Sequence, residues 1–118
     1  MANFNKYSHK KQFTYDSSKN EFIELKQYAV SYPEVKKLKV LGMFTYEGKK
    51  GTRAAIVIEG FNINLPSHMV DDVRAILKDE DGEIADINAG HCGFEIDTYE
   101  DNKYGNGICY TGNFYQID

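Results

Sequence analysis

Aromatic and basic side chains gather around one short turn of the chain. The turn, Gly48-Lys49-Lys50-Gly51, joins two strand-like segments, residues 36–47 and 52–63. An antiparallel hairpin centred between the two lysines has one apolar face, which pairs Met43 with Ile56 and Leu41 with Ile58. We expect that face to join the core. The opposite face pairs Tyr46 with Arg53, Phe44 with Ala55 and Gly42 with Val57.

The second face of this hairpin suits single-stranded nucleic acid. Bases stack on rings such as Phe44 and Tyr46, and each stacked base contributes ~1–3 kcal/mol whatever its identity. Lys49, Lys50 and Arg53 carry charge that neutralises phosphates, so affinity should fall steeply with salt. The alternative is that both rings pack beneath another element, such as the N-terminal segment. A slip of one residue in the register would move both rings into the core and remove the site.

Two connections outside this hairpin offer further contacts to nucleic acid. The connection before the hairpin contributes Tyr32, Lys36 and Lys37, and the turn over residues 101–106 contributes Lys103 and Tyr104. The predicted nucleic-acid-binding set is therefore Tyr32, Lys36, Lys37, Phe44, Tyr46, Lys49, Lys50, Arg53, Lys103 and Tyr104.

The net charge of −4 hides an asymmetry along the chain. Residues 1–53 hold eleven Lys and Arg against five Asp and Glu, whereas residues 54–118 hold three against thirteen. An acidic protein of this kind can carry a basic face, so its net charge does not exclude a polyanionic partner. The alternative is that basic and acidic side chains mix on the solvated surface of the folded protein, although they are unevenly distributed along the sequence.

A metal-dependent nuclease is a remote alternative. Such enzymes often combine a Pro-acid pair with a later Glu-x-Lys, and Pro33-Glu34 and Glu47-Gly48-Lys49 fit that pattern, with carboxylates for a divalent cation. The pattern is short, and Lys49 lies in the predicted turn rather than on a central strand. No Ser, His or Cys has a partner that we can place for nucleophilic catalysis. We therefore expect neither an enzyme nor a cofactor.

No metal site is predicted. The acidic run Asp79-Glu80-Asp81-Gly82 resembles a calcium loop, but an EF-hand with its glycine there would begin at Leu77 instead of an aspartate. Metal-ligand spacing is also absent among His68, His91, Cys92 and Cys109. Two cysteines cannot make a disulfide scaffold, so reduced thiols are expected.

The hydrophobic pattern predicts one mainly β domain over residues 1–118. Residues 1–20 read as an arm or a loose first element, and a helix begins at Pro66-Ser67, with a further helical turn near Ile84 and Ile87. The expected strands are residues 22–32, 36–47, 52–63, 92–100 and 107–117. A helix between the third and fourth strands gives the order of a five-stranded OB-fold-like barrel. An open α+β sheet with one packed helix is the main alternative.

The chain has no membrane or export signal that we can identify. No apolar run approaches the roughly 20 residues of a membrane span, and the first residues lack the apolar segment of a secretory signal. We expect a cytoplasmic protein with no membrane partner.

Two stretches resemble the small single-stranded-DNA-binding proteins of lactococcal and related phages. They are MANFNKYSHKKQFTYDSSKNEFIELKQY at the start and GHCGFEIDTYEDNKYGNGICY over residues 90–110. The resemblance covers most of the chain. It implies an OB-fold, single-stranded DNA binding without strong sequence preference, roles in phage replication and recombination, and the host cytoplasm. The chain departs from bacterial counterparts because it lacks their Gly- and Gln-rich linker and acidic tip.

A protein-interaction or structural module is the second hypothesis from another class. The acidic helix region, residues 71–86, would then be the working surface, and it could also contact other replication or recombination proteins. A single small domain offers a short DNA track, so homo-oligomers would help it to cover long strands.

Overall fold

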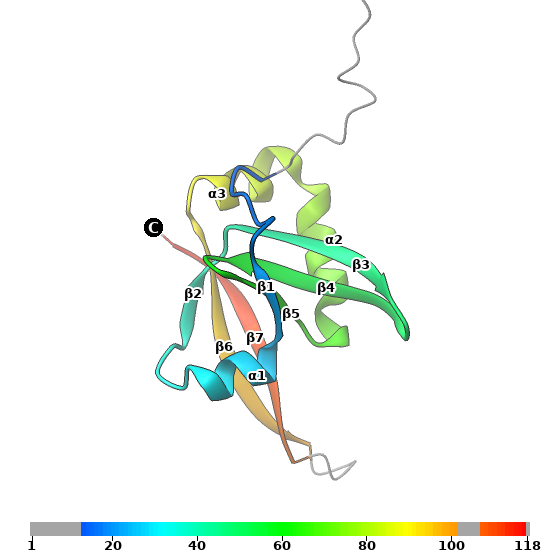
Figure 1. Cartoon of the computed structure of the whole chain (residues 1–118). Helices are drawn as coiled ribbons and strands as arrows, with labels where there is room; N and C mark the ends of the chain where they lie inside the picture. The colour runs from blue at the N-terminus through cyan, green and yellow to red at the C-terminus, as the bar shows by residue number, and fades with distance from the viewer. Residues whose placement is uncertain (1–12, 102–106, 118) are drawn as a thin grey trace, which may run out of the picture.

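The computed structural model describes residues 13–101 and 107–117, and it is mainly β with several short helices (Figure 1). The predicted contacts Lys103 and Tyr104 lie outside the described residues. The mainly β class is confirmed. The described strands pair into two separate sheets, and these do not close into one barrel.

The first sheet has the strand order β1-β5-β4-β3. Its strands are β1 (Glu21–Glu24), β5 (Phe61–Asn64), β4 (Gly51–Ile58) and β3 (Gly42–Gly48). The pairs β3–β4 and β4–β5 are antiparallel, whereas β1 runs parallel to β5. The register predicted for the hairpin is confirmed, because Met43 pairs with Ile56 and Tyr46 pairs with Arg53.

The second sheet has the order β2-β6-β7 and is antiparallel throughout. Its strands are β2 (Lys37–Lys39), β6 (Cys92–Asp101) and β7 (Gly107–Gln116). Val40 and Leu41 connect β2 directly to β3. The Val40 N–H donates to Cys92 in the second sheet, and the Leu41 N–H donates to Val57 in the first. One bent segment, residues 37–48, therefore contributes to both sheets.

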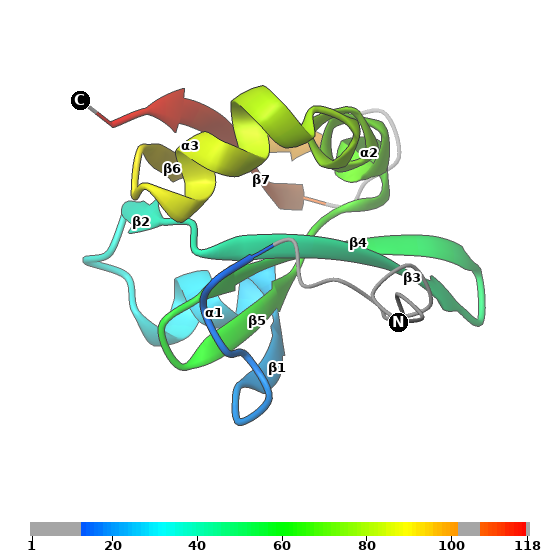
Figure 2. The same ribbon diagram turned by 90° about the horizontal axis from the view of Figure 1, so that it is seen from above.

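One helix precedes the β3–β4 hairpin in the chain, and the other helical segments follow β5. They are α1 (Leu25–Ser31), the 3₁₀ turn η2 (Ser67–Met69), α2 (Val70–Lys78), the π turn η3 (Glu80–Ile84) and α3 (Ala85–Asn88). Figure 2 shows α2 and α3 along one side of the molecule, with β1, β5 and α1 along the opposite side. The predicted helix after Pro66 and the further turn near Ile84 are confirmed.

The core draws its largest fully buried side chains from both sheets and from α2. They are Phe94, Met43, Ile56, Ile63, Leu65, Val40 and Val73. Alternation along β3 and β4 sends Met43 and Ile56 inward, as the sequence predicted. We call this side of the first sheet the inner face and the opposite side the outer face.

Three strand predictions are wrong in part. Residues 36–47 form two strands, β2 and β3, which belong to different sheets. Residues 22–32 form a strand only as far as Glu24 and continue as α1, whose buried Leu25 and Tyr28 are three residues apart. That spacing is helical, and the aromatic and β-branched residues nearby concealed it. Residues 52–63 form two strands instead of one, because a turn at Glu59-Gly60 interrupts them, with Gly60 at a φ of 90°.

Candidate nucleic-acid interface

The outer face of the first sheet presents two aligned rows of side chains. Period-2 alternation puts every second residue of each strand on this face. One row follows the register Glu24, Asn64, Ala55 and Phe44, and the next follows Phe22, Asn62, Val57 and Gly42. Beyond the first row, Tyr46 lies opposite Arg53. The face therefore combines large rings at its two edge strands with smaller residues between them.

Three rings from the two edge strands meet on this face. The Phe22 ring centroid lies 6.0 Å from that of Phe44 and 6.3 Å from that of Tyr46, and both pairs are edge-to-face. Phe44 and Tyr46 are themselves 6.0 Å apart. We call Phe22, Phe44 and Tyr46 the outer aromatic cluster. Its members come from β1 and β3, which have β5 and β4 between them, so the rings lean over the middle of the sheet.

The rings of the cluster differ in exposure. Phe22 is 59% exposed, whereas Phe44 and Tyr46 are half-buried. The sequence predicted small neighbours that leave the rings uncovered. Instead, Ala55 and Val57 are themselves buried, on the face over which the rings lean. The exposed aromatic surface of the cluster therefore belongs mainly to Phe22.

A polar network adjoins the cluster. The Tyr46 hydroxyl donates a 2.7 Å hydrogen bond to Asn64 Oδ1, and Asn64 Nδ2 donates at 3.4 Å to Glu24 Oε1. Arg53 Nη2 donates at 2.9 Å to Glu24 Oε2. This network satisfies Asn64, one of the two buried polar residues of the described chain.

The N-terminal segment covers one end of the outer face. A Cβ atom built on Gly42 would lie 3.2 Å from the Phe13 ring, so glycine at this position makes room for Phe13. Asn20 Nδ2 donates at 3.1 Å to Asn62 Oδ1. The N-terminal segment therefore covers the end of the face near Gly42, while Phe22 stays exposed. The side chain that leans against Phe44 and Tyr46 is Phe22 of β1.

The predicted basic residues of the hairpin have different environments. Lys49 and Lys50 are exposed in the turn between β3 and β4. Arg53 was predicted as a phosphate contact, but it forms an ion pair with Glu24, and its side chain is 35% exposed. The charge available at this face therefore comes first from the two lysines.

The other predicted contacts lie elsewhere in the fold. Tyr32 follows α1 and packs against Tyr28, with ring centroids 4.8 Å apart. Lys36 is exposed in the loop before the second sheet, and Lys37 belongs to that sheet, where it lies 3.7 Å from Glu95. The ring contact of Tyr32 with Tyr28 and the ion pair of Lys37 with Glu95 do not involve the outer aromatic cluster.

The residues of the nuclease pattern are far apart along the fold. Glu34 lies in the loop before β2, whereas Glu47 lies at the far end of β3 and accepts a 2.7 Å hydrogen bond from Thr52. The extended segment 37–48 lies between them. Over residues 13–101 and 107–117, no group of three or more His, Cys, Asp or Glu side chains could hold a metal ion.

Acidic residues of the helix region have local roles. Asp71 lies 3.8 Å from Arg74 on the same helix, and Asp79 Oδ1 accepts a 3.1 Å hydrogen bond from the Gly82 N–H. Arg74 Nη2 also donates to Thr52 on β4 at 3.0 Å. The Arg74 bond joins α2 to β4 and the Asp79 bond closes the turn after α2, whereas the Asp71 side chain remains 94% exposed.

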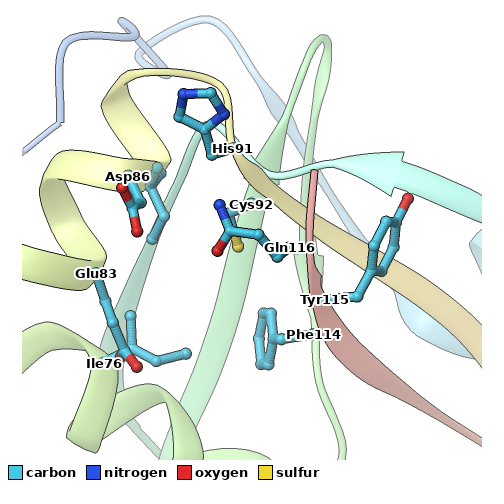
Figure 3. Close-up of a pocket in the computed structure, with 9 residues that line it drawn as sticks. Ile76, Glu83, Asp86, His91, Cys92, Phe114, Tyr115 and Gln116 are labelled. Carbon is cyan, nitrogen blue, oxygen red and sulfur yellow. The ribbon is translucent and has the colours of Figure 1, made fainter. Parts of the chain in front are cut away.

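A pocket of about 200 Å³ lies where α3 meets the second sheet (Figure 3). Cys92, Glu83 and Asp86 line it, and His91 Nδ1 donates a 2.9 Å hydrogen bond to the Ile117 carbonyl. Burial raises the pKa of the Cys92 thiol to about 11, and the carboxylates of Glu83 and Asp86 add to the rise. A thiol held in its neutral form is a poor nucleophile.

Sequence reasoning missed four members of the outer face: Phe22, Glu24, Asn62 and Asn64. The alternation of residues 21–24 places Phe22 and Glu24 on one side of a strand, which was a usable signal. Phe22 and Glu24 lie near β3 because β1 pairs in parallel with β5. Parallel strands are not joined by a short turn, so no local sequence signal predicts that pairing.

Comparisons with known proteins leave the family open. No family model, curated protein or solved structure matches the chain. Among the helices of the described residues, none has both the length and the apolar character needed to cross a membrane.

Proposed function

We propose that the protein binds single-stranded DNA without strong sequence preference on the outer face of the first sheet. The observation that carries this proposal is the outer aromatic cluster, in which Phe22, 59% exposed, stands against Phe44 and Tyr46. An exposed phenylalanine offers a π-face to any base, and a stacked base contributes ~1–3 kcal/mol. Duplex DNA keeps its bases stacked on one another, so this mode favours the single strand.

The charge at the face supports the same proposal. Lys49 and Lys50 project from the turn that joins β3 to β4, at the Tyr46 end of the cluster. Two exposed ammonium groups beside stacked bases neutralise phosphates and release counterions. Glu24 also lies on this face, but Arg53 compensates its charge. The face is therefore not repulsive to a polyanion.

The order of elements supports an OB-like architecture. The bent segment 37–48 joins both sheets, the antiparallel strands β4 and β5 follow it, and the helices precede the hairpin β6–β7. This is the order of an OB-fold, with β1 and α1 added before it. In OB-folds the face of strands 2 and 3 and the loop between strands 1 and 2 bind oligonucleotides, and these correspond here to β4, β5 and the turn between β3 and β4. The resemblance to phage proteins extends the proposal to phage replication or recombination, with self-association on long strands.

Fluorescence anisotropy of a labelled 35-nucleotide oligo(dT) tests the proposal. We expect binding to the single strand, much weaker binding to a matching duplex, and an affinity that falls as salt is raised. The variant Phe22→Ala should weaken binding, whereas Val30→Ala removes a comparably exposed apolar side chain from α1 and should not. Absence of binding at low salt would exclude the proposal.

A further inference from the structure

A cleft of about 300 Å³ lies beside the polar network, where the ends of β1 and β5 approach β7. The residues that matter for its chemistry are Glu24, Lys26, Arg53, Asn64, Ile108 and Tyr110. Its volume is at the lower end of the range of small-ligand sites, which is roughly 300–1,000 Å³. Asn64 connects the cleft to the outer aromatic cluster through its hydrogen bond with Tyr46.

The walls of the cleft suit a flat aromatic ligand. Ile108 and Tyr110 form the β7 side, and Ile108 is 58% exposed. The buried Leu65 and the adjoining Pro66 line the side formed by the end of β5. Apolar walls with a few convergent polar groups are typical of sites that take a planar heterocycle.

The polar groups present an ordered set of donors and acceptors. A carboxylate has about four acceptor positions and a guanidinium has five N–H donors. In the contacts above, Glu24 uses two of its acceptor positions and Arg53 uses one of its N–H donors. Both side chains can therefore make further hydrogen bonds without breaking their ion pair.

We propose, building on the proposed function, that this cleft receives one base of the bound strand and prefers guanine to thymine. The Watson–Crick edge of guanine carries an acceptor, O6, followed by two donors, N1–H and N2–H. Arg53 can donate to O6 while the Glu24 carboxylate accepts both N–H groups. Thymine offers one donor between two acceptors, so a carbonyl oxygen would face the carboxylate. Lys26, exposed on α1 at the rim, supplies a charge for the adjoining phosphate.

A short oligonucleotide series tests this inference. Anisotropy is measured with a 12-nucleotide oligo(dT) and with the same oligonucleotide carrying one central dG, dA or dC. One good bidentate contact discriminates by ~1 kcal/mol or more, so the dG oligonucleotide should bind at least about five-fold more tightly than oligo(dT). The dA oligonucleotide controls for stronger stacking of purines on the aromatic cluster and should show a smaller gain.

Glu24→Gln is the decisive variant, because it keeps the shape of the side chain and removes the charged acceptor. It should abolish the preference for dG, which is measured as the ratio of the affinities of the same variant for the dG oligonucleotide and for oligo(dT), so that any change in overall binding caused by releasing Arg53 cancels. Glu21→Gln makes the same charge change on β1 outside the cleft lining and should keep the preference.

The outcomes of this series distinguish failure of the guanine site from failure of the proposed function. Oligo(dT) binding without a gain for dG, or an equal gain for dA, would overturn the guanine site and leave the proposed function standing. An unchanged dG preference in Glu24→Gln would also overturn it. Failure of every oligonucleotide to bind would overturn both.

Discussion

The Tyr46 hydroxyl donates a 2.7 Å hydrogen bond to Asn64 Oδ1 and so links β3 to β5 across the intervening strand β4. The bond holds the Tyr46 ring over the sheet and satisfies an amide that is only 9% exposed. One side chain thus contributes to both the stability of the face and its proposed stacking surface.

These two contributions of Tyr46 can be separated. Tyr46→Phe removes the hydroxyl and keeps the ring, so the free energy of unfolding should fall by about 1 kcal/mol while oligo(dT) affinity stays unchanged. Urea denaturation and anisotropy measure the two effects. Tyr15→Phe is the matched control, because its hydroxyl makes only long contacts of 3.3 and 3.4 Å. A loss of DNA binding in Tyr46→Phe as large as in Tyr46→Ala would contradict a stacking role for the ring.

Phe22 should matter more for binding than for folding. Because its side chain is 59% exposed, Phe22→Ala should change the free energy of unfolding little and should weaken oligo(dT) binding about five-fold or more. Val30→Ala, from a side chain that is 61% exposed on α1, should change neither. Equal oligo(dT) affinities of the unsubstituted protein, Phe22→Ala and Val30→Ala would show that the DNA binds away from Phe22.

The two lysines of the β3–β4 turn should set part of the salt dependence. In the double variant Lys49→Ala with Lys50→Ala, the slope of log K against log salt should become less steep by about 1.4, since each single-strand phosphate contact contributes about 0.7. The same double change at Lys36 and Lys37 is the comparison, because Lys37 belongs to the second sheet. A similar change of slope there would mean that the bound strand also reaches the second sheet.

Cys92 should make stability pH-dependent in alkaline solution. Burial raises its pKa from the ordinary 9.0 to about 11, so the folded state keeps a proton that the unfolded state releases. The free energy of unfolding should therefore fall as the pH rises from 9 to 11. Urea denaturation at pH 8, 9, 10 and 11 measures this fall, which should be shallower in Cys92→Ala. If the free energy of unfolding falls equally with pH in the unsubstituted protein and in Cys92→Ala, titratable groups other than Cys92 cause the fall.

Gly112 should be intolerant of a side chain. A Cβ atom there would collide with the ring of Phe94, which is fully buried, and would lie 2.7 Å from the Glu95 carbonyl oxygen. Gly112→Ala should therefore destabilise the protein by ~1–3 kcal/mol. Gly93→Ala is the comparison, because the nearest atoms that a Cβ would meet there belong to the half-buried Tyr115 ring and not to a fully buried ring and the backbone. Thermal denaturation that ranks Gly93→Ala as the more damaging variant would refute this reasoning.

Local pattern predicted much of the fold. The glycine-bounded turn at Lys49 and Lys50 sets the register of β3 against β4, and period-2 alternation then decides that Met43 is buried while Phe44 lies on the other face. The apolar spacing after Pro66 predicted α2, and the strand-like patterns of residues 92–100 and 107–117 predicted β6 and β7. These features depend on neighbours a few residues away, and so a single sequence contains them.

The tertiary structure decided what lies on the outer face. Phe22 reaches Phe44 because β1 pairs in parallel with β5, and residues 25–31 form a helix because packing against the core outweighs a weak strand preference. The ion pair of Arg53 with Glu24 joins residues that are 29 positions apart. Such pairings are selected by the burial of a common core, and no local periodicity encodes them. The sequence by itself therefore determined an aromatic hairpin with a basic tip, and only the folded chain determined which ring is exposed and which cation is already paired.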